Sequence, residues 1–495
     1  MRKTPAFLAL FLIAILAVIP FAGDSPESAR HSDASPYRCT SIIVGKNATA
    51  DGSVLLGHNE DWGAYLKPLS WNPGEKHKPG EAFKLRDGQA IPQVEGTHSF
   101  IWPAAECNGI NEHQVALVDD TGSCRKELFQ NERGIDLEEF VTLALQRSRS
   151  AREAVHLMGG LIEKYGYRSH NGRDGDIFSI ADPNEGWWME ITIGGIWAAQ
   201  RVPDDSFVVL ANRFRIQEVD LSDKSRFLAS PNLVDYAKQK GWYDPAQGPF
   251  NFSRVYGLVE EARAAYNTRR EWRGNSLLAG RAFEEKENPL PVIPARKLSP
   301  RDLMALFRDH YEGTEYDLTN RYEKGSPHHT PERTICRLAT DASTVAQLRS
   351  GLPPEIGGVL WLSAGTPCSS VYIPFYLGVL EFPKPFSFLT EGYSRDNAYW
   401  VFNSLENLVD RYYNEKAKFG ESEMRAIDYV GELWKSFEDE EFAMQEAVEK
   451  TALDLYKKDK ALARSFLTTY SNGLGLKAFH QAQTLPDTLR KKYYR

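Results

Sequence analysis

Cysteine is scarce in this chain, and the scarcity limits what can hold the fold together. Five cysteines among 495 residues are too few for a small scaffold built on disulfides. No group of Cys and His residues has the spacing of a zinc site, and no His-Glu-x-x-His helix occurs. The sequence therefore predicts no metal and no cofactor, and it argues against a zinc peptidase.

Excess basic charge and long apolar runs are missing from most of the chain. The 59 Lys and Arg residues are outnumbered by 67 Asp and Glu residues, and the net charge of −8 argues against nucleic acid as a partner. After residue 22, no stretch is long and apolar enough to cross a bilayer. Hydrophobic residues nevertheless make up 42% of the chain, enough for a sizeable core. This combination predicts a large, mildly acidic globular protein, a class in which enzymes are common.

The first 22 residues have the pattern of a targeting segment. A basic start, Met1-Arg2-Lys3, precedes an almost unbroken apolar run over residues 7–22. Such a pattern predicts a signal peptide, 1–22, with cleavage near Ala22-Gly23; an uncleaved anchor is the alternative. We therefore expect a secreted or periplasmic protein without stable membrane embedding after the signal is removed.

A polar, Ser-rich segment follows, and the composition changes abruptly at Cys39. Residues 23–38 contain too little apolar surface to fold alone and are predicted to be a propeptide. Residues 39–45 and 54–61 read as two strands joined by the turn signal Asp51-Gly52. Further strands are expected at 177–181, 187–192, 196–200, 207–211, 361–365 and 371–376, and a helix over 136–158 with Asp136 as its cap.

A cysteine at the first position of a folded domain has a specific chemical use. A thiol is a strong nucleophile only as thiolate, and its ordinary pKa of about 8.5 leaves little thiolate at neutral pH. An N-terminal cysteine carries its own base, because its α-amine titrates at about 7.7–8.0. Cleavage of the Arg38–Cys39 bond by an N-to-S acyl shift would expose that amine. A lipid-modified cysteine, half of a disulfide and a buried strand cysteine are the alternatives.

The residues around Cys39 resemble a known family. The chain is similar to the cysteine dipeptidases of the N-terminal-nucleophile hydrolases, a group that includes dipeptidase A enzymes and secernins, with penicillin V acylases and bile salt hydrolases as distant relatives. The resemblance runs to about Pro374 and is carried, in order, by Cys39-Thr40-Ser41-Ile42-Ile43-Val44-Gly45, Gly57-His58-Asn59-Glu60-Asp61, Gly109-Ile110-Asn111-Glu112, Trp187-Trp188-Met189-Glu190, Ala211-Asn212-Arg213-Phe214, Pro331-Glu332-Arg333-Thr334 and Pro367-Cys368-Ser369-Ser370.

The resemblance implies an α+β fold, a four-layer αββα sandwich of two mainly antiparallel sheets between two helical layers. The catalytic domain is then expected over residues 39–394, with a helical C-terminal region, 395–495, packed on the core. Within that region, periodicity predicts helices over 398–417, 422–435, 439–458 and 461–471, with Gly420 and Pro486 as breaks.

The resemblance also implies roles for four residues. Cys39 is the expected nucleophile, and Asn212 matches an asparagine that stabilises the oxyanion. Asp61 matches an aspartate beside the nucleophile's amine. Arg333 matches a late arginine close to the thiol, where its charge would lower the cysteine pKa.

Two departures from the acylase pattern concern substrate-binding candidates. His58 stands where the acylase relatives carry an arginine, which leaves the charge near Cys39 open. The second oxyanion donor falls near Asp119-Asp120-Thr121, none of which is the expected asparagine or tyrosine. A backbone N–H is an alternative donor, and the acidic side chains are an alternative site for a dipeptide's free amine. His58, Asp120 and Thr121 are therefore predicted to bind substrate.

The leading hypothesis is an exported cysteine dipeptidase that hydrolyses short peptides through a thioester on Cys39. An N-acyl amidase of the same mechanism and a non-catalytic secernin-like protein are the alternatives. Short peptides are the expected partners, and a homo-oligomer is compatible with the sequence.

The adjacent His328-His329 pair is not expected to bind one ion. The remaining cysteines allow three disulfide pairings or stay free thiols: Cys107, Cys124, Cys336 and Cys368.

Overall fold

The structure is a computed structural model that describes residues 38–61, 67–103, 108–128, 133–169, 172 and 174–493. The expected signal peptide, the propeptide other than Arg38, and Cys107 lie outside the described residues. Tyr37–Arg495 forms one compact unit, separate from Met1–Pro36.

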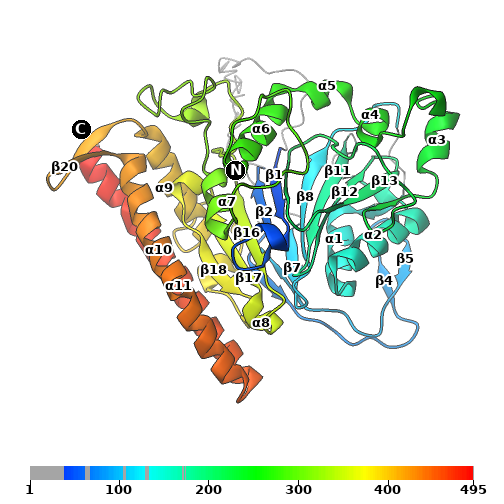
Figure 1. The fold of residues 1–495 in the computed structure, drawn as a ribbon. Coiled ribbons are helices and arrows are strands. Elements are labelled where there is room, and N and C mark those ends of the chain that lie inside the picture. The colour runs from blue at the N-terminus through cyan, green and yellow to red at the C-terminus, as the bar shows by residue number, and fades with distance from the viewer. Residues whose placement is uncertain are drawn as a thin grey trace, which may run out of the picture. The chain divides into compact units, whose positions relative to one another are not determined.

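One layer is a six-stranded antiparallel sheet with β1 as an inner strand (Figure 1). Cys39 immediately precedes β1. The expected hairpin of 39–45 and 54–61 is confirmed as β1 paired with β2. Gly52 forms its turn at φ 76°, a conformation that glycine adopts without strain, and the Asp51 side chain accepts the Ser53 N–H. The strand order is β14 (Phe207–Leu210), β1 (Thr40–Val44), β2 (Val54–Glu60), β16 (Ala342–Leu348), β17 (Val359–Ala364) and β18 (Ile373–Tyr376).

An eight-stranded antiparallel sheet stacks on the first, with β1 against β8, β11 and β12. Asn111 forms the expected turn between β7 and β8, where its side-chain oxygen accepts the N–H groups of His113 and Val115. The order is β15 (Phe227–Ala229), β13 (Trp197–Val202), β12 (Gly186–Ile191), β11 (Gly175–Ala181), β8 (Ala116–Gly122), β7 (Gly109–Asn111), β6 (Phe100–Trp102) and β3 (Ser70–Asn72).

Side-chain alternation along the strands explains the layering. On β11, Ile177 belongs to the core between the sheets, whereas Phe178 and Ile180 join the core under α1 and α2. Helices α6 (Ala265–Ala279) and α7 (Pro300–Phe307) cover the other sheet, against β14, β2 and β16. The architecture is therefore the expected four-layer αββα sandwich.

The single helix expected over 136–158 is two helices, α1 (Leu137–Arg147) and α2 (Ala151–Tyr165). The residues between them include Ser150, whose side chain accepts the Glu153 N–H and starts the second helix. Asp136 is the N-cap of α1, as expected, and forms a reciprocal capping box with Glu139. The spacing of apolar residues stays helical from α1 into α2, so periodicity alone did not reveal the break between the two helices.

The C-terminal region differs from its predicted boundaries. The helix expected over 398–417 ends early, as α9 (Ala398–Arg411). A hairpin of β19 (Lys416–Phe419) and β20 (Ser422–Arg425) follows, with Gly420 at φ 64° in its turn, so the first residues of the helix expected at 422–435 form a strand. The two helices expected at 422–435 and 439–458 are one, α10 (Ala426–Tyr456). Pro486 does not end a helix but lies within α11 (Lys460–Tyr493). Helices α10 and α11 run side by side, and α11 packs on α9 and β18 (Figure 1).

The other elements are short and connect these layers. They are β4 (Ala82–Lys84), β5 (Ala90–Pro92), β9 (Ile135–Asp136), β10 (Tyr167–Arg168), α3 (Leu233–Gln239), α4 (Phe252–Tyr256), α5 (Val259–Arg263) and α8 (Pro354–Gly357), with 3₁₀ turns at Lys46–Ala48, Pro245–Gln247, Pro327–His329, Pro367–Ser369 and Lys384–Phe386.

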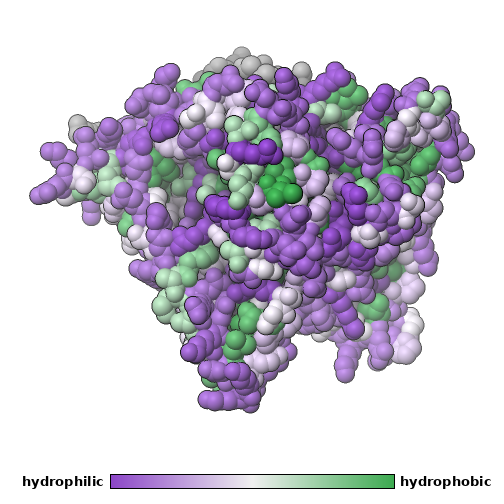
Figure 2. Space-filling view, in the orientation of Figure 1, coloured by the Kyte–Doolittle hydropathy of each residue, from purple (hydrophilic) through white to green (hydrophobic). Residues whose placement is uncertain are grey.

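The surface agrees with the composition. Figure 2 shows a mostly hydrophilic face on which hydrophobic side chains gather in small separate groups. Among the described residues, no helix combines the length and the apolar character that crossing a membrane requires.

Candidate active site

The Cys39 thiol lies in a buried position at the head of β1. Its residue is 4% exposed, and its Sγ donates to Glu60 Oε1 at 3.4 Å. The pairing of β1 with β2 produces this contact, because Thr40 faces Asn59 in the register and Glu60 is the last residue of β2. The nucleophile predicted from the sequence therefore has a carboxyl group as its direct partner.

Arg333 joins the residues on both sides of the nucleophile. Its guanidinium donates to the carbonyl oxygen of Arg38 and to Asp61 Oδ2. Asp61 also accepts a hydrogen bond from Thr340, at 2.5 Å on Oδ1. Both carboxylate oxygens of Asp61 are therefore hydrogen-bonded, one to the Arg333 guanidinium and the other to the Thr340 hydroxyl. Arg333 contacts the carbonyl of the very bond whose cleavage would free the Cys39 amine.

Arg270, on α6, contacts the other side of the nucleophile. Its Nη1 donates to the carbonyl of Cys39 and, at 2.9 Å, to Thr40 Oγ1. Its Nη2 donates to Asn212 Oδ1 at 2.9 Å. The Asn212 amide nitrogen in turn donates to the Thr121 carbonyl at 2.9 Å and keeps a second N–H. Arg270 therefore fixes the orientation of Asn212 relative to Cys39.

His58 and Asp120 form a second polar layer in which both side chains are buried. His58 Nε2 lies 3.4 Å from Asp120 Oδ1, and Asn108 donates to His58 Nδ1 at 3.1 Å. Ser41 donates to the second oxygen of Asp120. The Asn108 amide also lies 3.3 Å from Glu60 Oε2, which links this layer to the nucleophile's partner.

Burial dominates the protonation of the cluster. Desolvation, reinforced by the charges of Glu60, Asp120 and Asp61, raises the pKa of the Cys39 thiol well above its ordinary value. Arg333 contacts the Arg38 carbonyl and Asp61, so the lowering of the thiol pKa expected from its charge stays a prediction. Desolvation also raises the pKa of Glu60 to about 8. For His58, desolvation lowers the pKa, but Asp120 and Glu60 outweigh it and raise the pKa above 6.5.

The structure brings all seven sequence-predicted site residues into one network, in which Arg38, Ser41 and three additional side chains also take part. Arg333 links Asp61 to the Arg38 carbonyl, and Arg270 links the Cys39 carbonyl to Asn212. Asp120 contacts His58 and Ser41. The Thr121 carbonyl accepts a hydrogen bond from Asn212. The additional residues are Glu60, Asn108 and Arg270. Glu60 lay within a quoted motif and could have been singled out as a carboxyl beside the nucleophile. Asn108 and Arg270 carried no sequence signal.

The donor atoms of Cys39, His58 and Glu60 lie within 4.8 Å of one another, a spacing that a metal ion can bridge. However, the Asn108 amide already bonds to both His58 Nδ1 and Glu60 Oε2. The arrangement is better suited to moving a proton between the thiol and a carboxylate than to holding an ion.

Most of the sequence is similar to a known family of peptidases. The model of peptidase family C69 matches residues 90–425. The chain is 30% identical over 438 residues to a probable dipeptidase of Latilactobacillus sakei, covering 84% of this chain and 88% of the relative. It is 31% identical over 365 residues to a probable dipeptidase of Salmonella dublin, covering 70% and 82%. Dipeptidase A of Lactobacillus helveticus is 28% identical over 400 residues, covering 76% and 82%.

A solved structure is also similar. It is a mutant conjugated bile acid hydrolase from Clostridium perfringens, with 12% identity, a TM-score of 0.29 and coverage of 66% of this chain and 89% of that one. The family match begins after the β1–β2 hairpin, so the case for Cys39 comes from the hairpin's own motif and contacts. On the family match and the relatives together, the chain belongs to peptidase family C69 and is a hydrolase of peptide bonds.

Proposed function

We propose that this protein is an exported cysteine dipeptidase whose nucleophile, Cys39, becomes the N-terminus by self-cleavage. One observation carries the proposal. The Arg333 guanidinium donates to the carbonyl oxygen of Arg38, and the Cys39 thiol beside that carbonyl donates to the Glu60 carboxyl group. The names of the relatives support the dipeptidase activity. The apolar N-terminal segment supports export.

Self-cleavage begins with the thiol. Cys39 Sγ attacks the Arg38 carbonyl carbon as its proton passes to the Glu60 carboxylate, and Arg333 donates to the oxygen that becomes negative. The C–N bond then breaks, the nitrogen of Cys39 takes the proton from Glu60, and Arg38 is left as a thioester on Sγ. Water hydrolyses this thioester, releasing the propeptide carboxylate and regenerating the thiol.

Peptide hydrolysis repeats these steps on an external substrate. The free α-amine of Cys39 accepts the thiol proton, Sγ attacks the scissile carbonyl, and the proton passes to the leaving amine. The second N–H of Asn212 is the proposed oxyanion donor, because Arg270 and Thr121 hold its amide beside β1. Water then hydrolyses the thioester formed with the substrate's N-terminal residue.

The surroundings of the Arg38 side chain support a binding position for that residue. The thioester formed with Arg38 and the one formed with a dipeptide carry their acyl groups on the same sulfur. The Arg38 guanidinium stacks 3.6 Å over the ring of Tyr266 and lies 3.8 Å from Glu261 Oε1. An aromatic face with an adjacent carboxylate suits a positively charged group, including the free amine or basic side chain of a dipeptide.

Parallel assays of dipeptides and N-acyl amino acids test the proposal. We expect the purified protein to hydrolyse dipeptides, with preference for a basic N-terminal residue, and Cys39→Ala to lose about a thousandfold or more of that activity. Cys124→Ser, a change at a buried thiol outside the cluster, is the matched control and should retain activity. Hydrolysis of N-acyl amino acids alone would favour the amidase alternative, and undiminished dipeptide hydrolysis by Cys39→Ala would refute the mechanism.

A further inference from the structure

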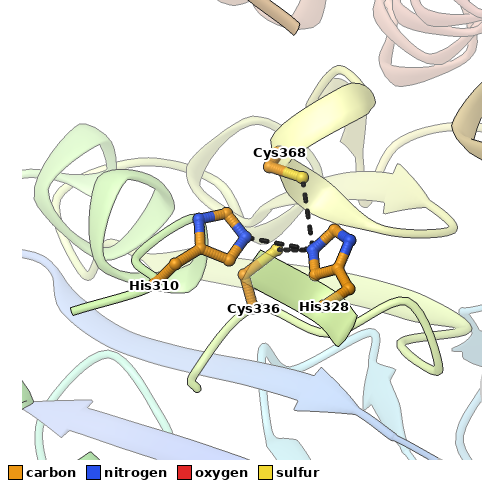
Figure 3. Close-up of side chains that lie close together, drawn as sticks. All are labelled: His310, His328, Cys336 and Cys368. Atoms are coloured by element: carbon orange, nitrogen blue, oxygen red, sulfur yellow. Dashed lines mark hydrogen bonds between the residues drawn. The ribbon is translucent and has the colours of Figure 1, made fainter. Parts of the chain in front are cut away.

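Four side chains far from one another in the sequence converge beside α7 and α9. The donor atoms of His310, His328, Cys336 and Cys368 all lie within 4.8 Å of one another (Figure 3). The His310 and His328 side chains are 1% and 2% exposed, and Cys336 is fully buried. Nothing in the proposed peptidase mechanism uses these groups, so their convergence needs a separate explanation.

Carboxylates fix the direction of both imidazoles. His310 Nδ1 lies 3.0 Å from Glu312 Oε1, and His328 Nδ1 lies 2.9 Å from Asp410 Oδ1. A carboxylate accepts a hydrogen bond from Nδ1–H, and in a neutral ring Nε2 then carries the lone pair that can bind a metal. These two Nε2 atoms face each other at 3.1 Å. With both rings neutral, two lone pairs at this distance would repel, so the contact needs either a proton shared in an N–H···N hydrogen bond or a metal cation between the rings.

The two cysteines complete a four-donor set. Cys368 Sγ and Cys336 Sγ lie 3.8 and 4.0 Å from His328 Nε2. Zn–S bonds of about 2.3 Å and Zn–N bonds of about 2.0–2.1 Å give a tetrahedron with edges of about 3.3–3.8 Å. The observed separations are close to these edges. Imidazole and thiolate in a tetrahedral Cys₂His₂ set favour zinc, and carboxylates behind metal-bound histidines are the usual outer partners.

We propose that His310, His328, Cys336 and Cys368 bind one structural zinc ion. Binding deprotonates the two thiols, so two protons pass to solvent and the sulfurs bind as thiolates. All four positions of the tetrahedron are filled by protein, which is the pattern of a structural rather than a catalytic site. A cavity of about 630 Å³ lined in part by Cys368 and Tyr413 gives the ion a route of entry.

The site has a structural task that follows from its position. Arg333 lies in the loop between two of the ligands, His328 and Cys336, and contacts Arg38 and Asp61 in the candidate active site. The Asp410 partner belongs to α9 in the C-terminal region. The zinc would therefore tie the loop that presents Arg333 both to the core and to the C-terminal helices.

Metal analysis of the purified full chain, produced with zinc in the medium, tests this proposal directly. We expect about one zinc per chain and no free thiol at Cys336 or Cys368 until a chelator removes the metal. Cobalt added to the chelated protein should give the intense visible absorption of a tetrahedral Co²⁺–thiolate site. His328→Gln and Cys368→Ser should lose the metal, whereas the neighbouring His329→Gln and the buried Cys124→Ser should keep it.

Asp410→Asn keeps all four ligands and removes only the carboxylate behind His328. We expect it to fold and to bind zinc about 10–100-fold more weakly, measured by competition with a chromogenic chelator. A Cys336–Cys368 disulfide found in the native protein would overturn the proposal. Metal-free protein with both thiols reduced that takes up neither zinc nor cobalt would also overturn it. Because these readouts do not involve peptidase activity, they fail or succeed independently of the function proposed for Cys39.

Discussion

Cys39 and Glu60 share a hydrogen bond in a site from which water is largely excluded, and that exclusion changes the chemistry of both groups. Desolvation raises the pKa of Glu60 to about 8 and raises that of the thiol as well. A carboxylate with a pKa of about 8 is a better base for a thiol than an ordinary glutamate, because the gap between the two pKa values is smaller. In the proposed self-cleavage, before the Cys39 amine is free, we expect Glu60 to accept the thiol proton.

The pH dependence of self-cleavage tests this role. Only the deprotonated form of Glu60 accepts a proton, so the rate of Arg38–Cys39 cleavage should rise about tenfold per pH unit below pH 8 and level off above it. Glu60→Gln should slow cleavage by about 10²–10⁴-fold and abolish this inflection. Gel or mass analysis of freshly made precursor measures the rate, with the turn variant Glu112→Gln as control. A rate that is constant from pH 6 to 9 would exclude Glu60 as the base.

Glu261 is the residue that we expect to select a basic N-terminal residue in the substrate. Glu261 lies 3.8 Å from the Arg38 guanidinium, whereas its neighbour Glu260 is exposed. Glu261→Gln should lower kcat/KM for dipeptides with a basic N-terminal residue by about 10-fold, while Glu260→Gln leaves it unchanged. Steady-state kinetics on Arg- and Ala-headed dipeptides measure the change. An equal loss on both substrates would show that Glu261 supports the fold and does not select the substrate.

At the scale of elements, the start of α1 depends on one side chain. Asp136 accepts the Glu139 N–H, and one of its oxygens also lies 3.0 Å from the exposed Arg86. Asp136→Ala removes both contacts and should lower the free energy of unfolding by about 1 kcal/mol, whereas Asp136→Asn keeps the cap and should lose much less. Urea unfolding measures both. Equal losses in the two variants would mean that the ion pair with Arg86 matters more than the cap.

The elements also show what the sequence could predict. Strong local signals were sufficient for the β1–β2 hairpin, for six further strands and for the Asp136 cap, whereas the short strands and β16 were not predicted. The break between α1 and α2 and the fusion of two predicted helices into α10 depend on tertiary packing, which local periodicity does not encode. The resemblance supplied the layer order, which a single sequence's periodicity would not have given.

The candidate site was predictable only where its residues lay in recognisable motifs. Cys39, Asp61 and Arg333 fell within such motifs, and the structure brings them together. Arg270 is one of several arginines on α6 and acquires its position only when that helix packs over β14. His310, His328 and Cys336 are separated by 18 and 8 residues, which matches no metal motif, so the sequence argued against the site that the fold assembles.

The whole molecule carries carboxyl groups in its interior that should govern its stability. Besides Glu60, burial raises the pKa of Glu190 and of Glu406 to about 8 each. An unfolded chain would lose these protons near pH 4.5, whereas the folded chain keeps them until about pH 8. Between these values the folded state binds more protons, so raising the pH favours unfolding.

We therefore expect the protein to be more stable at pH 5.5 than at pH 8. Urea unfolding at several pH values measures this, and the double variant Glu190→Gln, Glu406→Gln should show a flatter dependence because its neutral amides do not titrate. Glu423→Gln, on the exposed side of β20, is the control. Stability that increases from pH 5.5 to pH 8 would contradict the assignment of buried, protonated carboxyls.

The intact mass of the active protein tests the central claim most directly. Mass spectrometry and N-terminal sequencing of the purified enzyme should show a chain that begins at Cys39, and the Cys39→Ala variant should keep Arg38 attached and be inactive. A fully active enzyme in which every chain still carries Arg38 would contradict the claim that a free N-terminal cysteine performs the hydrolysis.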